Sequence, residues 1–193
     1  MNLFALNTPS ITGEVLCPGD KSISQRAVII GSLINQDMTI EGFLNGEDPI
    51  STINALNAIG SSIEIYNTSV TIKQRETAFI SPKEDVDLGN SGTGMRLMMG
   101  LISSLGINVR LVGDKSLSKR PMLRVSEPLN SMGANILCRD GMPPVQITKG
   151  NIKNNFSYDM PIASAQVKSS IILAALAANE SVTVKEKYQT RNH

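Results

Sequence analysis

The feature of this sequence that most constrains its fold is an internal repeat. The segment ALNAIGSSIEI begins at position 55, and the similar segment PLNSMGANILC begins at position 128, 73 residues later. Strands predicted after apolar helices begin at Met38, Val109 and Val182, which keeps nearly the same spacing. This period is longer than those of solenoid repeats. It predicts an α/β domain made of repeated βαβαββ units packed about a pseudo-threefold axis.

Each predicted unit contains one buried and one exposed helix. The buried helices are apolar on nearly every side, which is typical of helices without a face in water. They are predicted at 21–34, 92–105 and 165–178. The exposed helices are amphipathic and are predicted at 47–59 and 120–132. The first of these is expected to be capped near Asp48, with Pro49 at the first helical position.

Short extended segments are predicted after the helices, at 38–40, 62–66, 69–73, 108–112, 134–138, 145–148 and 182–184. Residues 3–16 also read as extended, and a Pro-Gly pair separates them from the first helix. We therefore expect residues 1–17 to belong with a second domain, and residues 18–193 to form the first globular domain. That domain would hold two complete units and an incomplete third unit, which lacks its exposed helix and closing strand pair, as in a piece of a longer protein.

The stretch PGDKSISQR places polar groups at the start of the first buried helix. Asp20 is a good N-cap residue. Lys21 and Ser22 fall in the first turn, and Arg26 lies four residues beyond Ser22 on the same face. A helix N-terminus attracts phosphate or carboxylate through its free N–H groups and partial positive charge. The alternative is a capped helix with solvated basic residues, and this stretch alone does not decide between the two.

The other two buried helices begin with comparable sequences, LGNSGTGMR and ASAQVKSS. If the units share one packing geometry, the three helix starts converge, which suits a doubly charged anion. The alternative is that the glycines form a turn and that Ser164 and Gln166 are ordinary caps. The basic run DKSLSKRPMLR has a solvated face as its alternative. Anion binding is favoured, because Arg120 is followed by Pro121 at a predicted helix start, which fixes its backbone.

The composition argues against several other classes of protein. A net charge of +1 and 4% aromatic residues do not suit a nucleic-acid-binding surface. No apolar run is long enough to span a membrane, and no secretory signal opens the sequence. Cys17 and Cys138 lack metal-ligand spacing and are interpreted as free thiols of a reducing cytoplasm. His193 is the only histidine, so we expect no metal site and no catalytic triad.

Four motifs in this order and spacing, PGDKSISQR, LGNSGTGMR, DKSLSKRPM and PIASAQVKS, resemble those of the 5-enolpyruvylshikimate-3-phosphate synthase family. The resemblance covers nearly the whole chain but only the N-terminal part of the family's usual length. It implies transfer of the enolpyruvyl group of phosphoenolpyruvate to the 5-hydroxyl of shikimate 3-phosphate, with release of phosphate and no cofactor. This reaction belongs to the shikimate pathway of aromatic amino acid biosynthesis.

Two alternatives stay open beside this family. The related UDP-N-acetylglucosamine enolpyruvyl transferase shares the fold, but it usually has asparagine in place of Ser22 and a cysteine in the loop at 115–120, and neither is present. The second alternative is a non-catalytic phosphate-binding module on the same fold.

The resemblance also implies roles for individual residues. Lys21 would be catalytic and would bridge the two substrates. The residues implied for shikimate 3-phosphate are Lys21, Ser22, Arg26, Ser164, Gln166 and Arg191. Those implied for phosphoenolpyruvate are Lys21, Gly92 through its backbone N–H, Arg120 and Gln166. With Gly92 in place, the intact enzyme is expected to be sensitive to glyphosate.

The chain departs from the family's pattern at two positions. Ala165 replaces a serine of many members, although a second branch shares this alanine and Lys168. Gln25 stands where histidine is common, and we expect it to lie behind the residues that touch the substrates. The resemblance implies that a carboxylate pair and further cationic residues come from a second domain beyond His193, so the chain alone is expected to be inactive. The intact enzyme is expected to be a cytoplasmic monomer without nucleic-acid or membrane partners.

Overall fold

The computed structural model describes residues 4, 10 and 12–187 of the chain. The elements of this part are α1 (Lys21–Ile34), β1 (Met38–Ile40), α2 (Glu47–Ala58), β2 (Ser62–Tyr66), β3 (Ser69–Lys73), β4 (Val86–Asp87), α3 (Gly92–Ile102), β5 (Val109–Val112), the 3-10 helix η1 (Leu117–Lys119), α4 (Leu123–Ser131), β6 (Asn135–Arg139), β7 (Met142–Thr148), β8 (Phe156–Met160), α5 (Ala165–Ala178) and β9 (Val182–Glu186). This alternation confirms the predicted α/β class. None of the described helices has the length and apolar character needed to cross a membrane.

The sheets repeat one another. β3 lies between β1 and β2 in one antiparallel sheet, and β7 lies between β5 and β6 in the same antiparallel order in a second. β4 pairs in parallel with β5 across α3, and β8 pairs in parallel with β9 across α5. The segment from β4 to β7 is therefore one complete βαβαββ unit. No strand precedes α1 in the described residues, so the first unit, predicted to be complete, lacks its leading strand there.

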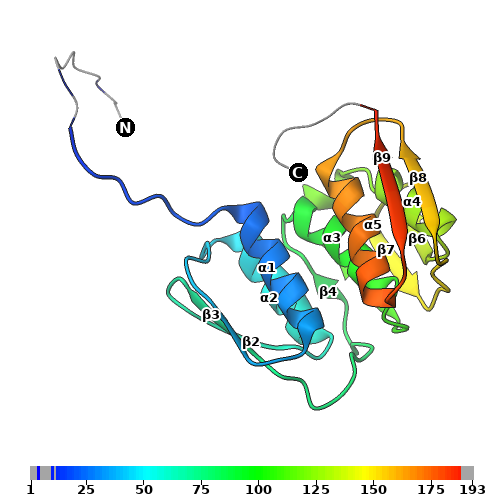
Figure 1. Cartoon of the computed structure of the whole chain (residues 1–193), viewed down its shortest axis with the longest axis horizontal. Helices are drawn as coiled ribbons and strands as arrows, with labels where there is room; N and C mark the ends of the chain where they lie inside the picture. Colours follow the sequence, from blue (N-terminus) through cyan, green and yellow to red (C-terminus); the bar gives the residue numbers. More distant parts are fainter. Residues whose placement is uncertain (1–3, 5–9, 11, 188–193) are drawn as a thin grey trace.

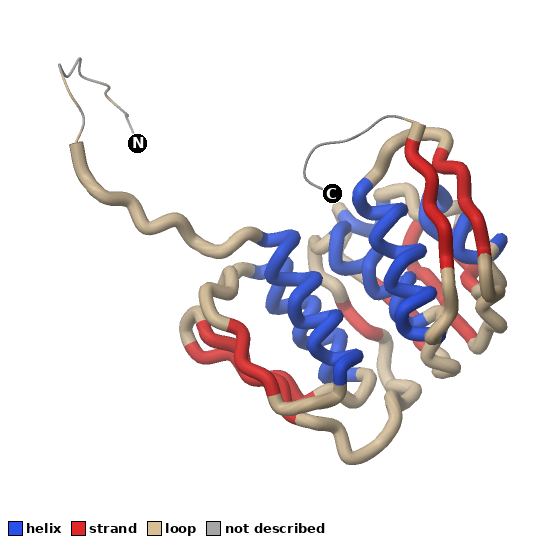
Figure 2. The backbone as a smooth tube through the Cα atoms, viewed as in Figure 1, coloured by secondary structure: helices blue, strands red, loops and turns tan. Residues whose placement is uncertain are grey.

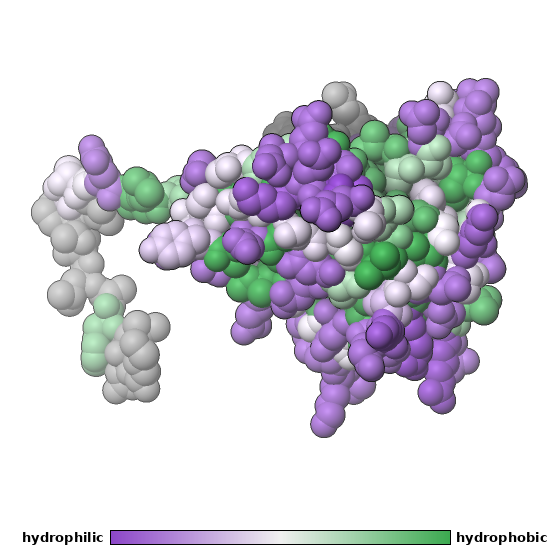
Figure 3. Space-filling model, turned by 90° about the horizontal axis from the view of Figure 1, so that it is seen from below, coloured by the Kyte–Doolittle hydropathy of each residue, from purple (hydrophilic) through white to green (hydrophobic). Residues whose placement is uncertain are grey.

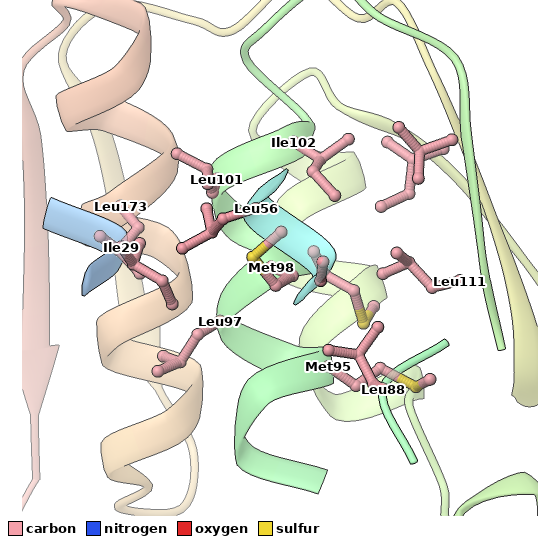
Figure 4. Close-up of a cluster of buried hydrophobic side chains, with 14 of the residues drawn as sticks. Ile29, Leu56, Leu88, Met95, Leu97, Met98, Leu101, Ile102, Leu111 and Leu173 are labelled. Atoms are coloured by element: carbon pink, nitrogen blue, oxygen red, sulfur yellow. The ribbon is translucent and has the colours of Figure 1, made fainter. Parts of the chain in front are cut away.

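The core is centred on α3, whose residues are all buried except Thr93. In Figures 1 and 2, α3 lies between the α1–α2 pair and α5, with β1–β3 outside the former and β8 and β9 outside the latter. Side chains from other elements pack against it, including Ile29 of α1, Leu56 of α2 and Leu173 of α5 (Figure 4). Each such burial contributes ~1.5–3 kcal/mol, so the packing around α3 fixes how the helix starts are arranged.

The three buried helices begin in the same way. Asp20, Ser91 and Ser164 are the N-cap residues of α1, α3 and α5. Their side-chain oxygens accept hydrogen bonds from backbone N–H groups of the first turn at 2.8, 3.1 and 3.4 Å respectively. In contrast, α2 and α4 have no side-chain cap. Since such a cap contributes about 1 kcal/mol, the polar residues at these three starts are part of what defines the helices.

The two exposed helices begin differently from the prediction. α2 follows Gly46 directly, so Pro49 is its third residue rather than its first, and Asp48 does not cap it. The helix predicted at 120–132 begins only at Leu123. A proline disfavours helical geometry at the preceding residue, and Arg120 is accordingly extended, with φ −88° and ψ 133°. Arg120 thus lies in the loop between η1 and α4, not in the helix.

One face of α1 is exposed, so the prediction that this helix is buried all round is wrong. The exposed apolar residues of the two outer buried helices are Ile23, Ile30 and Ile34 on α1, and Ile172 and Leu176 on α5. α2 packs against α1 and α3, and α4 packs against α3 and α5. Within the described residues, no third amphipathic helix packs across α5 and α1, so these apolar side chains have no helix covering them. Hydrophobic areas also reach the surface drawn in Figure 3.

Residues 12–18 form an exposed arm that runs away from the body of the molecule (Figure 1). The described residues of the stretch predicted as a strand at 3–16 are not part of any strand. The rest of that stretch lies outside the described residues. The division of the chain at 17 and 18 therefore stays a prediction.

Candidate functional site

Hydrogen bonds join the starts of the three buried helices in a closed ring. The hydrogen bonds run from Gln25 Nε2 of α1 to Ser91 Oγ before α3 (2.7 Å), from Gln166 Nε2 of α5 to Thr93 Oγ1 of α3 (3.0 Å), and from Arg26 Nη2 of α1 to Ser169 Oγ of α5 (2.9 Å). The predicted convergence of the three helix starts is therefore confirmed. Their partial positive charges add in one place, which favours an anion there.

A cavity of about 410 Å³ opens where these helix starts meet. It is lined by Ser22, Arg26, Thr93, Arg124, Ser164, Ala165 and Gln166. A second cavity of about 670 Å³ shares Ser22 and Arg26 with the first and lies between α1 and α5. The structure thus brings four of the predicted site residues, from two different helices, to one hollow.

Arg26 is held by the helix starts themselves. Its Nη1 donates to Ser22 O at 3.1 Å, and its Nε and Nη2 donate to Ser169 Oγ at 3.3 and 2.9 Å. Burial lowers the pKa of Arg26, and the nearby charge of Asp20 partly offsets this. An arginine nonetheless stays charged at neutral pH. Ser164 both caps α5 and lines the cavity, so its two interpretations are compatible.

Lys21 forms an ion pair with Asp48 of α2, with a distance of 2.9 Å between Nζ and Oδ2. The lysine side chain is 50% exposed and is not in the lining of either cavity. Ion pairs at such positions contribute ~0–1 kcal/mol. The ammonium group can therefore leave Asp48 for an anionic ligand at little cost in stability.

Gly92 leaves room for two guanidinium groups at the start of α3. A Cβ atom at this position would lie 2.8 Å from Arg120 Nη1 and 3.1 Å from Arg96 Nη1. The backbone N–H of Gly92, predicted to bind a ligand, donates to Asn90 O at 2.9 Å and is engaged in this structure. Asn90 also accepts hydrogen bonds from Arg120 and donates from Nδ2 to Asp114 Oδ2 at 2.6 Å, which holds the arginine beside the glycine.

Sequence reasoning missed two members of the arginine cluster, which consists of Arg96, Arg120 and Arg124. Arg96 is 5% exposed and donates from Nη1 to Gln166 Oε1 at 3.0 Å and from Nη2 to Pro121 O at 3.1 Å. Arg124 donates from Nη2 to the same oxygen of Gln166 at 2.9 Å. Burial, followed by the charges of Arg124 and Arg120, lowers the pKa of Arg96 to about 10.

None of the three arginines forms an ion pair with any carboxylate that the structure describes. Asp114 lies close enough to Arg120 for their charges to interact, but no described carboxylate is paired with Arg96 or Arg124. A bound anion would relieve the repulsion among the three arginines and would accept charge-assisted hydrogen bonds. This cluster can bind a phosphate or a carboxylate.

One signal in the sequence could have found Arg96. It follows Gly92 by four residues, as Arg26 follows Ser22, so each lies on the same helix face as a predicted site residue. Gln25 is fully buried, and its expected place behind the substrate-binding residues stays a prediction. Arg191, the remaining predicted site residue, lies outside the described residues.

Comparisons with known proteins place the chain in a family. The model of the EPSP synthase (3-phosphoshikimate 1-carboxyvinyltransferase) family matches residues 7–193. The chain is 45% identical over 183 residues to the 3-phosphoshikimate 1-carboxyvinyltransferase of Thermoanaerobacter sp. (strain X514), a match that covers 95% of this chain and 43% of that protein. It is 40% identical over 195 residues to the Legionella pneumophila (strain Corby) protein of the same name, covering 100% and 45%.

The fold is also similar to that of a solved relative. An EPSP synthase structure from Acinetobacter baumannii matches with a TM-score of 0.83 at 41% identity, over 93% of this chain and 41% of that one. The chain therefore spans less than half the length of these relatives.

Proposed function

Because the chain belongs to the EPSP synthase family, we propose that it supplies the shikimate 3-phosphate half-site and part of the phosphoenolpyruvate site of a 3-phosphoshikimate 1-carboxyvinyltransferase. The observation that supports this most is the arginine cluster, which forms no ion pair with a described carboxylate and adjoins the cavity lined by Arg26 and Gln166. Both substrates are polyanions. Partly desolvated guanidinium groups that are already in place stabilise such charges strongly.

In the proposed reaction, the 5-hydroxyl oxygen of shikimate 3-phosphate forms a bond to C2 of phosphoenolpyruvate. The hydroxyl proton leaves to a base, and C3 takes up a proton to give a tetrahedral intermediate. Phosphate then leaves from C2 as C3 loses a proton, which restores the enol double bond. Holding both reactants together contributes roughly 7–11 kcal/mol in favourable cases, and the residues of this chain would act mainly in this way.

Each predicted residue has a proposed task in this arrangement. Lys21 leaves Asp48 and bridges the two substrates as the catalytic cation. The proposed shikimate 3-phosphate ligands are Lys21, Ser22, Arg26, Ser164, Gln166 and Arg191, and the proposed phosphoenolpyruvate ligands are Lys21, Gly92, Arg120 and Gln166. The backbone N–H of Gly92 would have to exchange Asn90 O for the ligand.

We propose catalytic turnover only for the whole protein. We also propose that the whole protein is a monomer and works in the cytoplasm. For the 193 residues alone we expect ligand binding without turnover, because the family resemblance implies that the proton-transferring carboxylates lie in a second domain. Cys17 and Cys138 are both free thiols, which suits a reducing compartment. The arm formed by residues 12–18 is proposed to belong with that second domain, since it is exposed along its whole length.

A calorimetric titration of the chain with shikimate 3-phosphate tests this proposal. Wild type is expected to bind saturably, and Lys21→Ala and Arg26→Ala are each expected to weaken binding about tenfold or more. Arg110→Ala removes the same charge from an arginine that pairs with Asp85 and lines neither cavity, so it is the matched control. Equal affinity in all four proteins, or equal loss in all three variants, would contradict the proposed half-site.

A further inference from the structure

The side-chain amide of Gln166 is oriented by three hydrogen bonds. Its Oε1 accepts from Arg96 Nη1 at 3.0 Å and from Arg124 Nη2 at 2.9 Å, and its Nε2 donates to Thr93 Oγ1 at 3.0 Å. In the flipped orientation, the NH₂ group of Gln166 would face the N–H donors of two guanidinium groups. Donors cannot bond to one another, so the two arginines fix the orientation of the amide. Both lone pairs of Oε1 are used, and one N–H remains. Gln166 can therefore offer a ligand in the cavity only a hydrogen-bond donor.

Arg124 is the member of the arginine cluster that lines the cavity. It is exposed, is the second residue of α4, and lines the 410 Å³ cavity together with Arg26 and Ser164. Its hydrogen bond to Gln166 uses one of the five N–H donors of a guanidinium group. In the described part of the chain its other donors have no partner, whereas Arg96 is buried and is bonded through both terminal nitrogens.

The position of Arg124 also fits the charge of the cluster. Its charge is among the causes that lower the pKa of Arg96, so the guanidinium groups repel one another. A phosphate monoester carries about two negative charges near neutral pH, and placed against Arg124 it would offset this repulsion. Planar guanidinium groups also match phosphate geometry with two parallel hydrogen bonds.

Resting on the function proposed above, we propose that Arg124 is a further substrate-binding residue. It donates a hydrogen bond to an oxygen of a phosphate monoester, and it orients the Gln166 amide so that its N–H donates to the same ligand. Shikimate 3-phosphate and phosphoenolpyruvate both carry this group. Separate titrations with each decide between these two sources.

The first test follows the arginine Nε–Hε signals of the chain by NMR during titration with inorganic phosphate, shikimate 3-phosphate and phosphoenolpyruvate. The Arg124 signal, assigned by its loss in Arg124→Lys, is expected to shift with phosphate and with at least one of the two substrates. If a substrate binds and this signal does not move, the assignment of Arg124 is overturned while the proposed function stands. If phosphate moves it and neither substrate binds, the proposed function fails and the anion site stands. If no ligand moves it, the inference is overturned.

The second test separates direct binding from an effect through Gln166. Arg124→Ala is expected to weaken binding of the responsive ligand about ten- to hundredfold, and to weaken it further in a Gln166→Ala background. Lys119→Ala removes an exposed charge of the same basic run outside the cavity lining, and is expected to change affinity less than about twofold. Loss of the Arg124 effect in the Gln166→Ala background would mean that Arg124 only positions the amide. That result would overturn the direct contact.

Discussion

Gly92 determines how closely two guanidinium groups approach the backbone at the start of α3. A Cβ atom there would lie 2.8 Å from Arg120 Nη1 and 3.1 Å from Arg96 Nη1, which is closer than van der Waals contact. The atoms that would move are the ends of long side chains rather than backbone atoms. This glycine therefore determines the positions of the Arg96 and Arg120 guanidinium groups, and it has little effect on whether the chain folds.

Gly92→Ala is accordingly expected to weaken binding of phosphoenolpyruvate by about tenfold, because the methyl group displaces charge-assisted donors. The free energy of unfolding is expected to change by less than about 1 kcal/mol, since the clash is relieved by side-chain rotation. Calorimetry and urea unfolding of both proteins measure the two quantities. A large loss of stability with unchanged affinity would show that the glycine is needed for folding instead.

The two cysteines are expected to react with thiol reagents at different rates. Burial raises the pKa of Cys138, and a hydrogen bond with Ser126 offsets this only in part. A raised pKa leaves less thiolate at pH 8, and the thiolate is the nucleophile. Cys17 is exposed. One fast and one slow thiol should therefore appear with a disulfide reagent, the fast one missing in Cys17→Ser. The slow rate should keep rising with pH above 9; a plateau below that value would contradict the raised pKa.

Helices α3 and α5 pack backbone to backbone at one point. Gly100 of α3 faces the backbone of Ser170, and a Cβ atom at Gly100 would lie 2.2 Å from Ser170 O. The Ser170 hydroxyl in turn donates to Arg96 O at 2.7 Å, which links the two helices one turn from the site. The spacing of these helices sets where Gln166 lies relative to the arginine cluster.

Gly100→Ala is expected to destabilise the protein by about 1–3 kcal/mol, because backbone atoms of α5 must move. Gly31→Ala is the matched control, since Gly31 is also a buried helical glycine. A Cβ atom at Gly31 would meet Ile72 Cδ1 at 2.5 Å and Met38 Sδ at 3.0 Å, and both side chains can rotate away. Urea unfolding should therefore show a clearly smaller cost for Gly31→Ala. Equal costs would mean that the α3–α5 spacing is not limited by this contact.

Sequence reasoning succeeded for elements whose signals are local. The periodic apolar residues and the caps at Asp20 and Ser164 predicted α1 and α5, with the bounds that the structure has. Sequence reasoning failed where the structure depends on contacts between residues that are far apart in the chain. Asp48 pairs with Lys21 rather than capping α2, and Arg124 meets Gln166 from a separate helix. No spacing along the chain encodes such contacts, so the hydrogen bonds of Arg96 and Arg124 to Gln166 became visible only in the fold.

At the scale of the whole molecule, the repeat explains both the core and the exposed apolar face. Each amphipathic helix, α2 or α4, covers the side of two neighbouring buried helices. The pattern of α1 predicts apolar residues on every side but cannot say which sides have a neighbour. Ile29 is fully buried, while the adjacent Ile30 is 40% exposed. The difference in exposure between these two side chains depends on how the repeat units pack against one another, not on the sequence of the helix alone.

This difference can be measured with the same substitution at neighbouring positions. Ile29→Ala is expected to cost about 2–5 kcal/mol, because it removes packed atoms and leaves a cavity, whereas Ile30→Ala is expected to cost less than about 1 kcal/mol. Leu173 and Leu176 of α5, which are 4% and 52% exposed, form a second matched pair. Urea unfolding of the four variants at several protein concentrations gives the free energies. If Ile30→Ala costs as much as Ile29→Ala and the midpoint rises with concentration, the exposed face of α1 is covered by another molecule in solution.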